Sequence, residues 1–325
     1  MLDTACVFVT DGGYLAPSLL AAKQLLRQGI SDLADILIYT IDVDEAVTDR
    51  LAREIGHRLL GFVPLHSRAF VPPDGTSFHR NHVPVAALAR LTLEPEIPQQ
   101  YRNIIYLDGD IQVVGDISPL VQYRVPDGKI LAGRGSAWLD PHDEYAMQPP
   151  GYLDALGGVA PDDYFNSGVL AFNRDTWSSQ GPLALELFVR NADTFFRHDQ
   201  SALNSAFRES VHYFSPAYNF HAIYASAYAA KIVQPKIIHF TGQWKPWKRA
   251  SPHWGPRFYR SYVDLLSQHR GLHDFFEVAP LHIWALRQPK DWFDEARRLA
   301  RERTVLRERQ ALIADYLATG DFAVR

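Results

Sequence analysis

The chain has 325 residues, enough for one large α/β domain with an appendage or for two domains. Hydrophobic residues make up 47% of the chain and charged residues 22%, which is ordinary for a globular protein. The formal net charge of -4 argues against a nucleic-acid-binding protein, because such proteins usually present a basic surface. No apolar run reaches the roughly 18 residues that a transmembrane helix needs, so the sequence predicts no membrane span.

The N-terminal segment and the cysteine content bear on the compartment. The first ten residues contain an acid and continue directly into a strand-like pattern, whereas a signal peptide begins with basic residues before a longer apolar core. Cys6 is the single cysteine, so no internal disulfide can form. We therefore expect a cytoplasmic protein in which Cys6 is a small buried hydrophobic residue.

Strand-like and helix-like patterns alternate through the first part of the chain. Apolar runs predict strands at 5–10, 35–40 and 59–65, and helical patterns between them predict one helix that ends at Gly29 and another at about 44–54. This alternation predicts an α/β fold with a parallel, doubly wound sheet that binds ligands at the carboxyl ends of its strands. The first strand is not followed by G-x-G-x-x-G, and no P-loop sequence occurs, which argues against a dinucleotide-dependent dehydrogenase.

The remaining patterns are less regular. Residues 140–161 are rich in Pro, Gly and Asp and lack periodicity, so we expect a functional surface loop there. From Pro256 the pattern is helical to the end of the chain. The other predicted elements are strands at 104–107, 129–133 and 163–177 and from 237 onward, and helices at 85–93, 183–196 and 200–208.

The sequence Tyr-Leu-Asp-Gly-Asp-Ile at 106–111 places two carboxylates at the end of a predicted buried strand. Because side chains alternate along a strand, Asp108 and Asp110 should project to the same side, and Gly109 would leave room between them for a ligand. The two carboxylates repel each other unless a cation shares them, and their hard oxygens suit Mg²⁺ or Mn²⁺. For an isolated D-x-D, a polar turn is the commoner explanation, by roughly two to one.

Several motifs occur in one order that resembles glycosyltransferase family 8. These retaining, nucleotide-sugar-dependent enzymes include bacterial lipopolysaccharide galactosyl- and glucosyltransferases and glycogenin. The more specific match is His-x-x-Gly-x-x-Lys-Pro-Trp at 239–247 together with Tyr-Leu-Asp-x-Asp at 106–110. The resemblance extends from about residue 5 to 247. The matching positions are Asp11–Tyr14, Arg90, Asp108–Asp110, Tyr164–Gly168, Asp199–Gln200 and His239–Trp247.

The resemblance implies a metal site and a GT-A fold, which is a Rossmann-like, mostly parallel sheet flanked by helices, here followed by a helical C-terminal appendage. The metal ligands would be Asp108, Asp110 and His239, a carboxylate and imidazole set that suits Mn²⁺ (or Mg²⁺) better than Ca²⁺. A lone histidine in such a strand is more often a hydrogen-bonded core residue, but Gly242 and Lys245 follow it at the spacing of the family. By this likeness the Gly242 backbone and the Lys245 ammonium contact the diphosphate, and Pro246 with Trp247 packs the loop.

The same likeness implies where the donor nucleotide binds. Asp11 and Tyr14 match positions that hold the uracil ring, although Gly13 stands where many relatives have Asn. Tyr14 could equally be a packing residue at the entry of a helix. The complete expected donor-binding set is Thr10, Asp11, Tyr14, Arg90, Asp108, Gly109, Asn166, Gly242 and Lys245.

Two further matches concern the diphosphate and the sugar. Arg90 matches an arginine that bridges the two, although its flanking pattern departs from the family at Pro84 and Ala87; the alternative is a solvated charge on a helix. Asn166 lies in Tyr-Phe-Asn-Ser-Gly, which lines the sugar pocket in relatives. Its alternative is an ordinary asparagine in a turn.

The expected catalytic residues are Gln200, Asp199 and Lys245. Asp199 would bind sugar hydroxyls in the family, and it would also serve as the N-cap of the predicted helix at 200–208. Gln200 would lie nearest the anomeric carbon. An amide is a poor nucleophile compared with the carboxylate of a retaining glycosidase, so a front-side transfer is expected, with Gln200 steadying positive charge on the sugar.

The C-terminal helical region carries an apolar seam with sevenfold spacing. Residues 290–310 contain seven basic and five acidic side chains, a mixture typical of a solvated helix whose seam packs on the body or on a second subunit. A peripheral membrane contact is the second alternative. We expect a transferase domain at 1–255 and a helical region at 256–325. The seam consists of Trp292, Ala296, Leu299, Leu306, Ile313 and Leu317, interrupted by Arg303 and Gln310.

Together, these features predict a metal-dependent, retaining transferase that moves a hexose from UDP-galactose or UDP-glucose to a glycan or glycolipid acceptor, plausibly in lipopolysaccharide or another surface glycan. The alternatives are a sugar nucleotidyltransferase of the same fold and a catalytically silent sugar-nucleotide-binding protein. A nucleotidyltransferase would normally have a basic, Gly-rich loop after Thr10, which is absent. The complete metal set argues against a silent protein.

Overall fold

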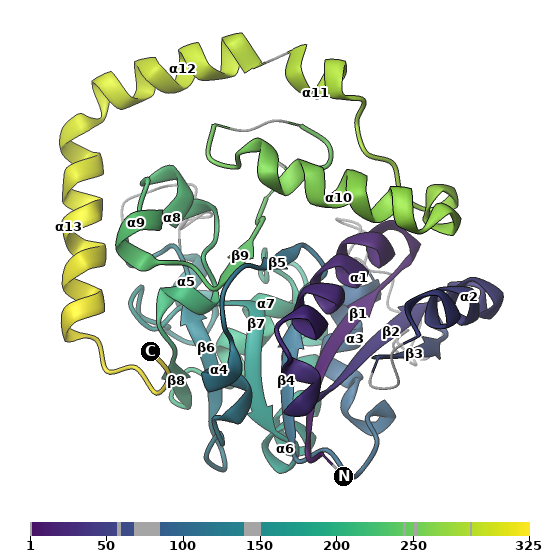
Figure 1. The fold of residues 1–325 in the computed structure, drawn as a ribbon. Coiled ribbons are helices and arrows are strands. Elements are labelled where there is room, and N and C mark those ends of the chain that lie inside the picture. The colour runs from purple at the N-terminus through teal and green to yellow at the C-terminus, as the bar shows by residue number, and fades with distance from the viewer. Residues whose placement is uncertain are drawn as a thin grey trace.

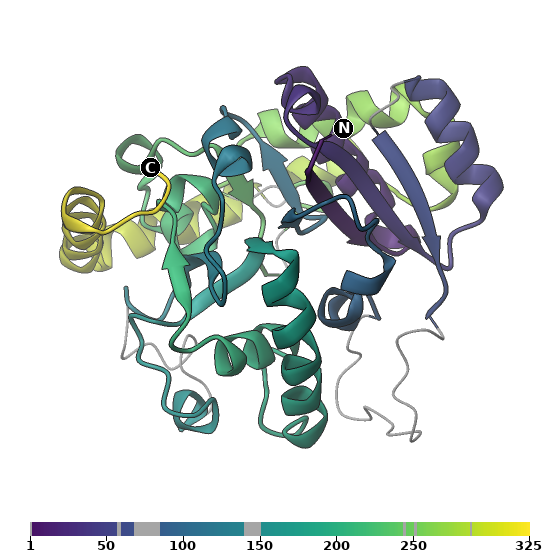
Figure 2. The same ribbon diagram turned by 90° about the horizontal axis from the view of Figure 1, so that it is seen from below.

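The computed structural model describes residues 2–56, 60–67, 85–139, 151–242, 245–249, 252–286 and 288–325. Helices pack on both faces of a central sheet, and the last helices pass around the outside of the molecule (Figures 1 and 2). In the described part of the chain, no helix is both long and apolar enough to cross a membrane.

The central sheet has seven strands in the order β3-β2-β1-β4-β7-β6-β8. The strands β3, β2, β1 and β4 are parallel to one another, as the alternating pattern predicted. The strand bounds are β1 Thr4–Thr10, β2 Asp35–Ile41, β3 Leu60–Leu65, β4 Asn103–Leu107, β6 Ile130–Arg134, β7 Phe165–Asn173 and β8 Val211–Tyr213.

The sheet is mostly parallel, as expected, and one of its strands runs the other way. β7 runs antiparallel to both β4 and β6, whereas β6 and β8 are parallel. Periodicity could not reveal this, because a strand buried on both faces is apolar whichever way it runs.

A second, two-stranded sheet was not anticipated. β5 (Ile111–Val113) pairs antiparallel with β9 (Ile237–His239), and in this register Ile111 lies opposite His239. This short pairing brings His239, at the end of β9, close to Asp108 and Asp110, although these residues are far apart in the sequence.

Two hydrophobic cores lie on opposite faces of the sheet. Cys6 and Phe8 of β1 point into the core under α1, α2 and α10, while Ala5 and Val7 point into the core under α3, α6 and α7. Cys6 is fully buried, and burial raises its pKa to about 12, so it is the small buried residue that the sequence indicated. The helices are α1 Gly12–Arg27, α2 Glu45–Ile55, α3 Val85–Thr92, α4 Ser118–Gln122, α5 Tyr152–Ala155, α6 Arg174–Arg190, α7 Asp199–Ala206, α8 Ala222–Ser226, α9 Ala230–Val233, α10 Pro256–Gln268, α11 Leu281–Leu286, α12 Gln288–Arg301 and α13 Arg303–Thr319.

Two helical boundaries differ from expectation. The helix expected at 183–196 begins instead at Arg174, because the Asn173 side chain caps it by accepting from Thr176 N at 2.8 Å. Gly181 and Pro182 lie inside this helix, which ends at Arg190. The expected loop at 140–161 contains the short helix α5, and its first part, 140–150, lies outside the described residues.

The C-terminal helices follow the apolar seam only in part. In α13, Leu306 and Ile313 are buried, and Ile313 joins a core cluster on the body. In α12, Ala296 is exposed and Trp292 is 52% exposed. The two helices are separated at Glu302, the N-cap residue of α13, so their faces do not form one continuous stripe.

Candidate active site

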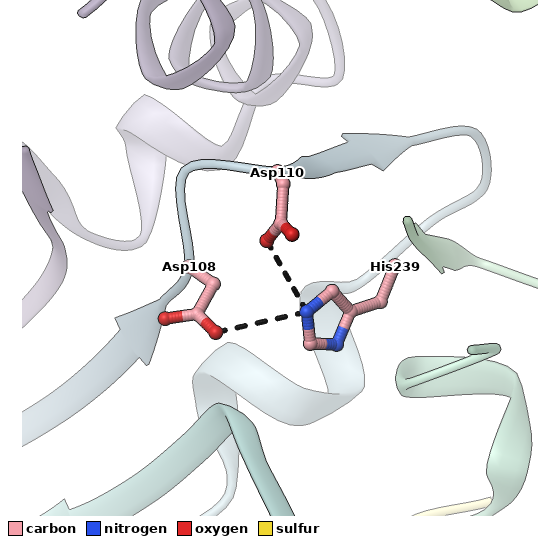
Figure 3. Close-up of side chains that lie close together, drawn as sticks. All are labelled: Asp108, Asp110 and His239. Atoms are coloured by element: carbon pink, nitrogen blue, oxygen red, sulfur yellow. Dashed lines mark ion pairs between the residues drawn. The ribbon is translucent and has the colours of Figure 1, made fainter. Parts of the chain in front are cut away.

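Three side chains converge at the end of β4, the start of β5 and the end of β9. Asp108 directly follows β4 and donates its backbone N–H to Gly168 O at 2.8 Å, Asp110 precedes β5, and His239 ends β9. His239 Nε2 lies 3.2 Å from Asp110 Oδ1 and 3.6 Å from Asp108 Oδ2 (Figure 3). One ligand atom from each of the three residues falls within 4.8 Å of the others, a spacing at which they could hold a metal ion. The structure thus brings the predicted ligand set together.

Two glycines make this convergence sterically possible. A Cβ on Gly168 would lie 2.0 Å from His239 Cε1 and 2.8 Å from Asp108 Oδ2, so any side chain there would displace two of the three ligands. A Cβ on Gly109 would lie 2.6 Å from Ser18 Oγ. Gly109 therefore allows α1 to approach the aspartates, which is a different reason from the ligand space that the sequence suggested.

Lys245 neutralises part of the acidic charge. Its Nζ donates to Asp110 Oδ2 at 2.5 Å and to Phe240 O at 2.7 Å. Burial would raise the pKa of Asp110, but Lys245 and His239 outweigh it and hold that pKa well below its usual range. Burial likewise lowers the pKa of Lys245, and Asp110 more than restores it, so the pair is ionised.

Arg90 is buried between two carboxylates. Its Nη2 lies 2.7 Å from Asp108 Oδ1 and its Nε 3.0 Å from Asp199 Oδ2. Its Nη1 donates to both the backbone oxygen and the hydroxyl of Ser167 at 3.1 Å. With 9% of the residue exposed, the alternative of a solvated helix charge is wrong.

Asp199 is the first residue of α7, and the N-cap position belongs to His198, whose φ is 50°. The expectation that Asp199 caps this helix is therefore wrong, because its carboxylate is directed at Arg90 instead. Burial raises the pKa of Asp199 to about 6, against the opposing effect of Arg90.

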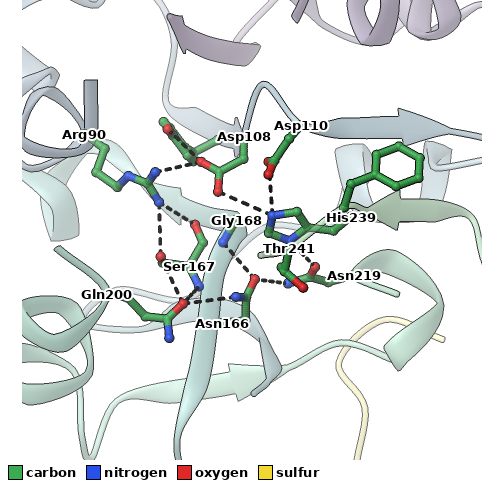
Figure 4. A network of polar contacts seen from close by, with 12 residues as sticks. Arg90, Asp108, Asp110, Asn166, Ser167, Gly168, Gln200, Asn219, His239 and Thr241 are labelled. Atoms are coloured by element: carbon green, nitrogen blue, oxygen red, sulfur yellow. Dashed lines mark hydrogen bonds and ion pairs between the residues drawn. The ribbon is translucent and has the colours of Figure 1, made fainter. Parts of the chain in front are cut away.

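Gln200 and Asn166 belong to a chain of amide contacts that leads to the metal-ligand set (Figure 4). Gln200 Oε1 accepts from Asn166 Nδ2 at 3.0 Å, and Gln200 Nε2 donates to Tyr164 Oη at 2.5 Å. Asn166 Oδ1 in turn accepts from Asn219 Nδ2 at 2.8 Å. Asn166 lies within β7, so it is not the asparagine of an ordinary turn.

This chain of contacts fixes the proton on His239. The backbone N–H of Gly168 donates to Asn166 Oδ1 at 3.1 Å, so that atom must be the amide oxygen. Asn219 must then use its Nδ2 toward Asn166, which turns its Oδ1 to His239 Nδ1 at 2.9 Å. His239 is thereby required to donate from Nδ1, which leaves Nε2 as the ring nitrogen that faces the aspartates.

Sequence reasoning missed Asn219. It lies between aromatic residues in Tyr-Asn-Phe, and nothing in its spacing relates it to His239. Its role depends on contacts with β7 and β9, which only the folded chain brings together.

The residues expected at the uracil lie at the start of α1. Thr10 is buried and its hydroxyl donates to Asp11 O at 2.8 Å, while Asp11 Oδ1 accepts from Tyr14 N at 3.2 Å and so caps α1. The Tyr14 ring is 37% exposed, 6.0 Å from the Trp247 ring and 5.9 Å from Lys245 Nζ. A ring exposed beside the lysine could stack on a ligand while its edge packs on Trp247.

The loop after β9 contains a glycine in the left-handed region and a tryptophan that packs as the motif suggested. Gly242 has a φ of 81°, in the left-handed region that favours glycine. Trp247 is buried against Tyr262 and Phe276, with ring centroids 4.8 and 5.6 Å away. Trp247 is therefore a packing residue that anchors the loop.

Comparisons with known proteins identify relatives of this chain. The lipopolysaccharide glucosyltransferase WaaO of Escherichia coli is 26% identical over 154 residues, which cover 45% of this chain and 44% of WaaO. The glycosyltransferase GlyE of Streptococcus pneumoniae is 23% identical over 264 residues, covering 76% of this chain and 57% of GlyE. The chain thus spans about half the length of these curated relatives.

Solved structures show the same fold. The galactosyltransferase LgtC, in complex with donor and acceptor sugar analogues, superposes with a TM-score of 0.63 at 24% identity, covering 80% of this chain and 95% of LgtC. The bifunctional glycosyltransferase WbbM gives a TM-score of 0.65 at 18% identity, with 84% of this chain and 51% of WbbM covered. Glycosyl transferase family 8 matches residues 6–251, which is most of the chain. The protein therefore belongs to glycosyl transferase family 8 and has a GT-A fold.

Proposed function

We propose that the protein is a metal-dependent, retaining glycosyltransferase that moves a hexose from UDP-galactose or UDP-glucose to a glycan acceptor. The observation that carries the proposal is the set of Asp108, Asp110 and His239, in which His239 Nε2 is directed at the two carboxylates. The family match and the name of WaaO favour an acceptor in lipopolysaccharide or another surface glycan.

The residues present fit a divalent cation. Two carboxylates and an imidazole suit Mn²⁺ or Mg²⁺, and Gly168 leaves the space between them free of a side chain. When bound, the metal would neutralise charge on the diphosphate as the sugar leaves. The chain's own part is to keep the carboxylates ionised and the His239 proton on Nδ1.

Arg90 and Lys245 supply two further positive charges at the same place. Each is buried and already paired with a metal-ligand aspartate, Arg90 with Asp108 and Lys245 with Asp110. Because both are held before substrate arrives, they can stabilise developing negative charge without reorganising. We assign them to the diphosphate, as the family likeness suggests.

Gln200 is proposed to stabilise positive charge on the sugar rather than to attack it. Its Oε1 already accepts from Asn166 and from the backbone N–H of Ser167 at 3.1 Å, which reduces its power as a nucleophile. The amide lone pair is delocalised in any case. These contacts favour a front-side transfer in which the leaving phosphate takes the acceptor's proton and the anomeric configuration is retained.

The test is to incubate the protein with a panel of UDP-sugars and Mn²⁺ and to measure UDP release. We expect turnover with UDP-galactose or UDP-glucose and loss of turnover on adding a chelator. NMR of the product should show the anomeric configuration of the donor. Inversion, or nucleotide exchange into a sugar phosphate without transfer, would contradict the proposal.

A further inference from the structure

A cavity of about 950 Å³ lies between α12 and the body of the protein. On the body side it is lined by α8, through Ala222, Ile223 and Ser226, and by Thr241. Figure 1 shows α12 on the outside of the molecule, passing above α8 and α9. Thr241 follows His239 by two positions, so the cavity adjoins the loop that leaves the metal-ligand set.

Polar contacts hold α12 beside this cavity. Arg249 of the body pairs with Asp291 at 2.6 Å, and Tyr228 donates to Glu295 at 2.9 Å. Arg298 donates to the backbone oxygen of Ser226 at 2.8 Å. The helix is thus tied to the body at several points along its length without closing the space between them.

The faces of α12 are arranged in an unusual way. Its carboxylates Asp291, Asp294 and Glu295 face the cavity, while Trp292 and Phe293 are 52% and 57% exposed. A helix that only covers a protein core buries its apolar face. The orientation of α12 therefore indicates that the cavity between α12 and the body binds a polar ligand.

The charges around the cavity balance. Its acids are Asp291, Asp294 and Glu295, and its bases are Arg249, Lys290 and Arg298. Arg249 pairs with Asp291 and Arg298 with Glu295. The exposed Asp294 and Lys290 can accept hydrogen bonds from a ligand rich in hydroxyl groups and donate to it. Balanced charge favours a neutral ligand over a polyanion. The volume is within the roughly 300–1,000 Å³ that is common for small-molecule sites.

Apolar surface completes the lining. Half-buried Ile223 and Pro252 form apolar parts of the cavity wall, and the buried Trp254, whose ring packs T-shaped against Phe240 at 5.0 Å, supports this wall from behind. Such surface suits the C–H faces of sugar rings.

We propose that this cavity, called the groove from here on, binds the sugars of the acceptor glycan that lie beyond the one receiving the hexose.

The proposal rests on the proposed transferase function and adds a second part to the acceptor site. One wall is joined to the catalytic loop, because Ala222 N donates to Thr241 Oγ1 at 3.1 Å. The other wall, α12, lies outside the family match at 6–251. The groove would therefore give this chain an acceptor preference that the shared part of the fold does not determine.

The experiment measures transfer from UDP-sugar to linear oligosaccharides of one to six glucose or galactose units. Two groove variants are compared with the unchanged protein: Asp294→Ala, which removes a carboxylate, and Ser226→Trp, which fills the space. Asp315→Ala is the matched control, because Asp315 is an exposed acid on α13 away from the cavity lining.

We expect kcat/KM to rise with acceptor length in the unchanged protein and in Asp315→Ala. Both groove variants should lose this rise, with KM for the longer acceptors increasing about tenfold, the equivalent of one or two hydrogen bonds. Binding of UDP with Mn²⁺, measured by calorimetry, should stay the same in all four proteins, which also shows that the variants fold.

Transfer that does not depend on length, or a length dependence that survives both groove substitutions, would overturn the groove as an acceptor subsite and leave the transferase function intact. Absence of UDP-sugar turnover with every acceptor and with water would instead refute the transferase function, and the groove proposal with it.

Discussion

The metal-ligand end of the site and the groove under α12 contain the same kinds of charged side chains in different settings. Asp108 and Asp110 are half-buried, and each is paired with a buried cation, Asp108 with Arg90 and Asp110 with Lys245. Around the groove, Asp294 and Lys290 are exposed on a helix held by polar contacts. The paired charges around Asp108 and Asp110 are preorganised for a transfer step that would be the same for every acceptor. The side chains of the groove can differ between related proteins without disturbing that step.

The same contrast is visible along the sequence. The buried end lies within residues 6–251, the part that family 8 matches, whereas α12 and α13 follow it. We therefore expect substitutions around Asp108 and Asp110 to lower both turnover and stability. Substitutions on α12 should change neither the fold nor the affinity for the donor.

The largest effect should come from Asp110→Asn. This change keeps the volume of the side chain but removes a ligand charge and leaves the buried Lys245 without its carboxylate. Breaking a buried pair costs about 3–5 kcal/mol, so we expect a lower thermal midpoint together with loss of Mn²⁺-dependent UDP-sugar binding. Far-UV circular dichroism at room temperature should remain native. Full activity in this variant would remove Asp110 from the site.

Gln200→Ala should have the next largest effect. If Gln200 only stabilises developing charge, its loss should lower kcat by about 10²–10³, the usual result of removing one stabilising dipole. The residual product should retain the anomeric configuration, and mass spectrometry with donor alone should find no glycosylated protein. A stoichiometric adduct on Gln200 would instead establish double displacement.

A pair of substitutions compares the two halves of the C-terminal seam. Ile313 is fully buried, so Ile313→Ala should destabilise the protein by about 2–5 kcal/mol in urea unfolding. Trp292 is 52% exposed, and Trp292→Ala should change stability by no more than about 0.5 kcal/mol. Equal losses at both positions would mean that α12 packs through its apolar face after all.

Asn219→Leu tests the residue that orients His239. Leucine has a similar size but can neither accept from His239 Nδ1 nor donate to Asn166. Loss of such an orienting partner typically weakens metal binding about 10–100-fold, which a Mn²⁺ titration followed by electron paramagnetic resonance would measure. Asn219→Asp keeps the acceptor for His239, so its loss of affinity should be smaller. If both variants bind Mn²⁺ like the unchanged protein, Asn219 does not position the ligand.

Much of this architecture can be predicted from local sequence patterns. The apolar runs that form β1 and β2 are bounded by polar residues and capped helices, so their positions follow from neighbours along the chain. The sequence also predicts that Asp108 and Asp110 lie on one side, because side chains alternate along a strand and the two residues are only two positions apart.

The rest depends on contacts between distant segments. The direction of β7, the pairing of β5 with β9 and the contact of Asn219 with His239 each join residues far apart in sequence. The apolar seam gave no sign that it breaks at Glu302 or that α12 turns its carboxylates inward. Only the tertiary environment decides these features.

The central claim is that Asp108, Asp110 and His239 hold a divalent cation that joins the UDP diphosphate to the protein. Calorimetric titration of the unchanged protein with UDP, with and without Mn²⁺, tests it most directly. We expect binding of UDP that needs Mn²⁺ and disappears when a chelator is added. Equally tight binding of UDP in the absence of any divalent cation would contradict the claim.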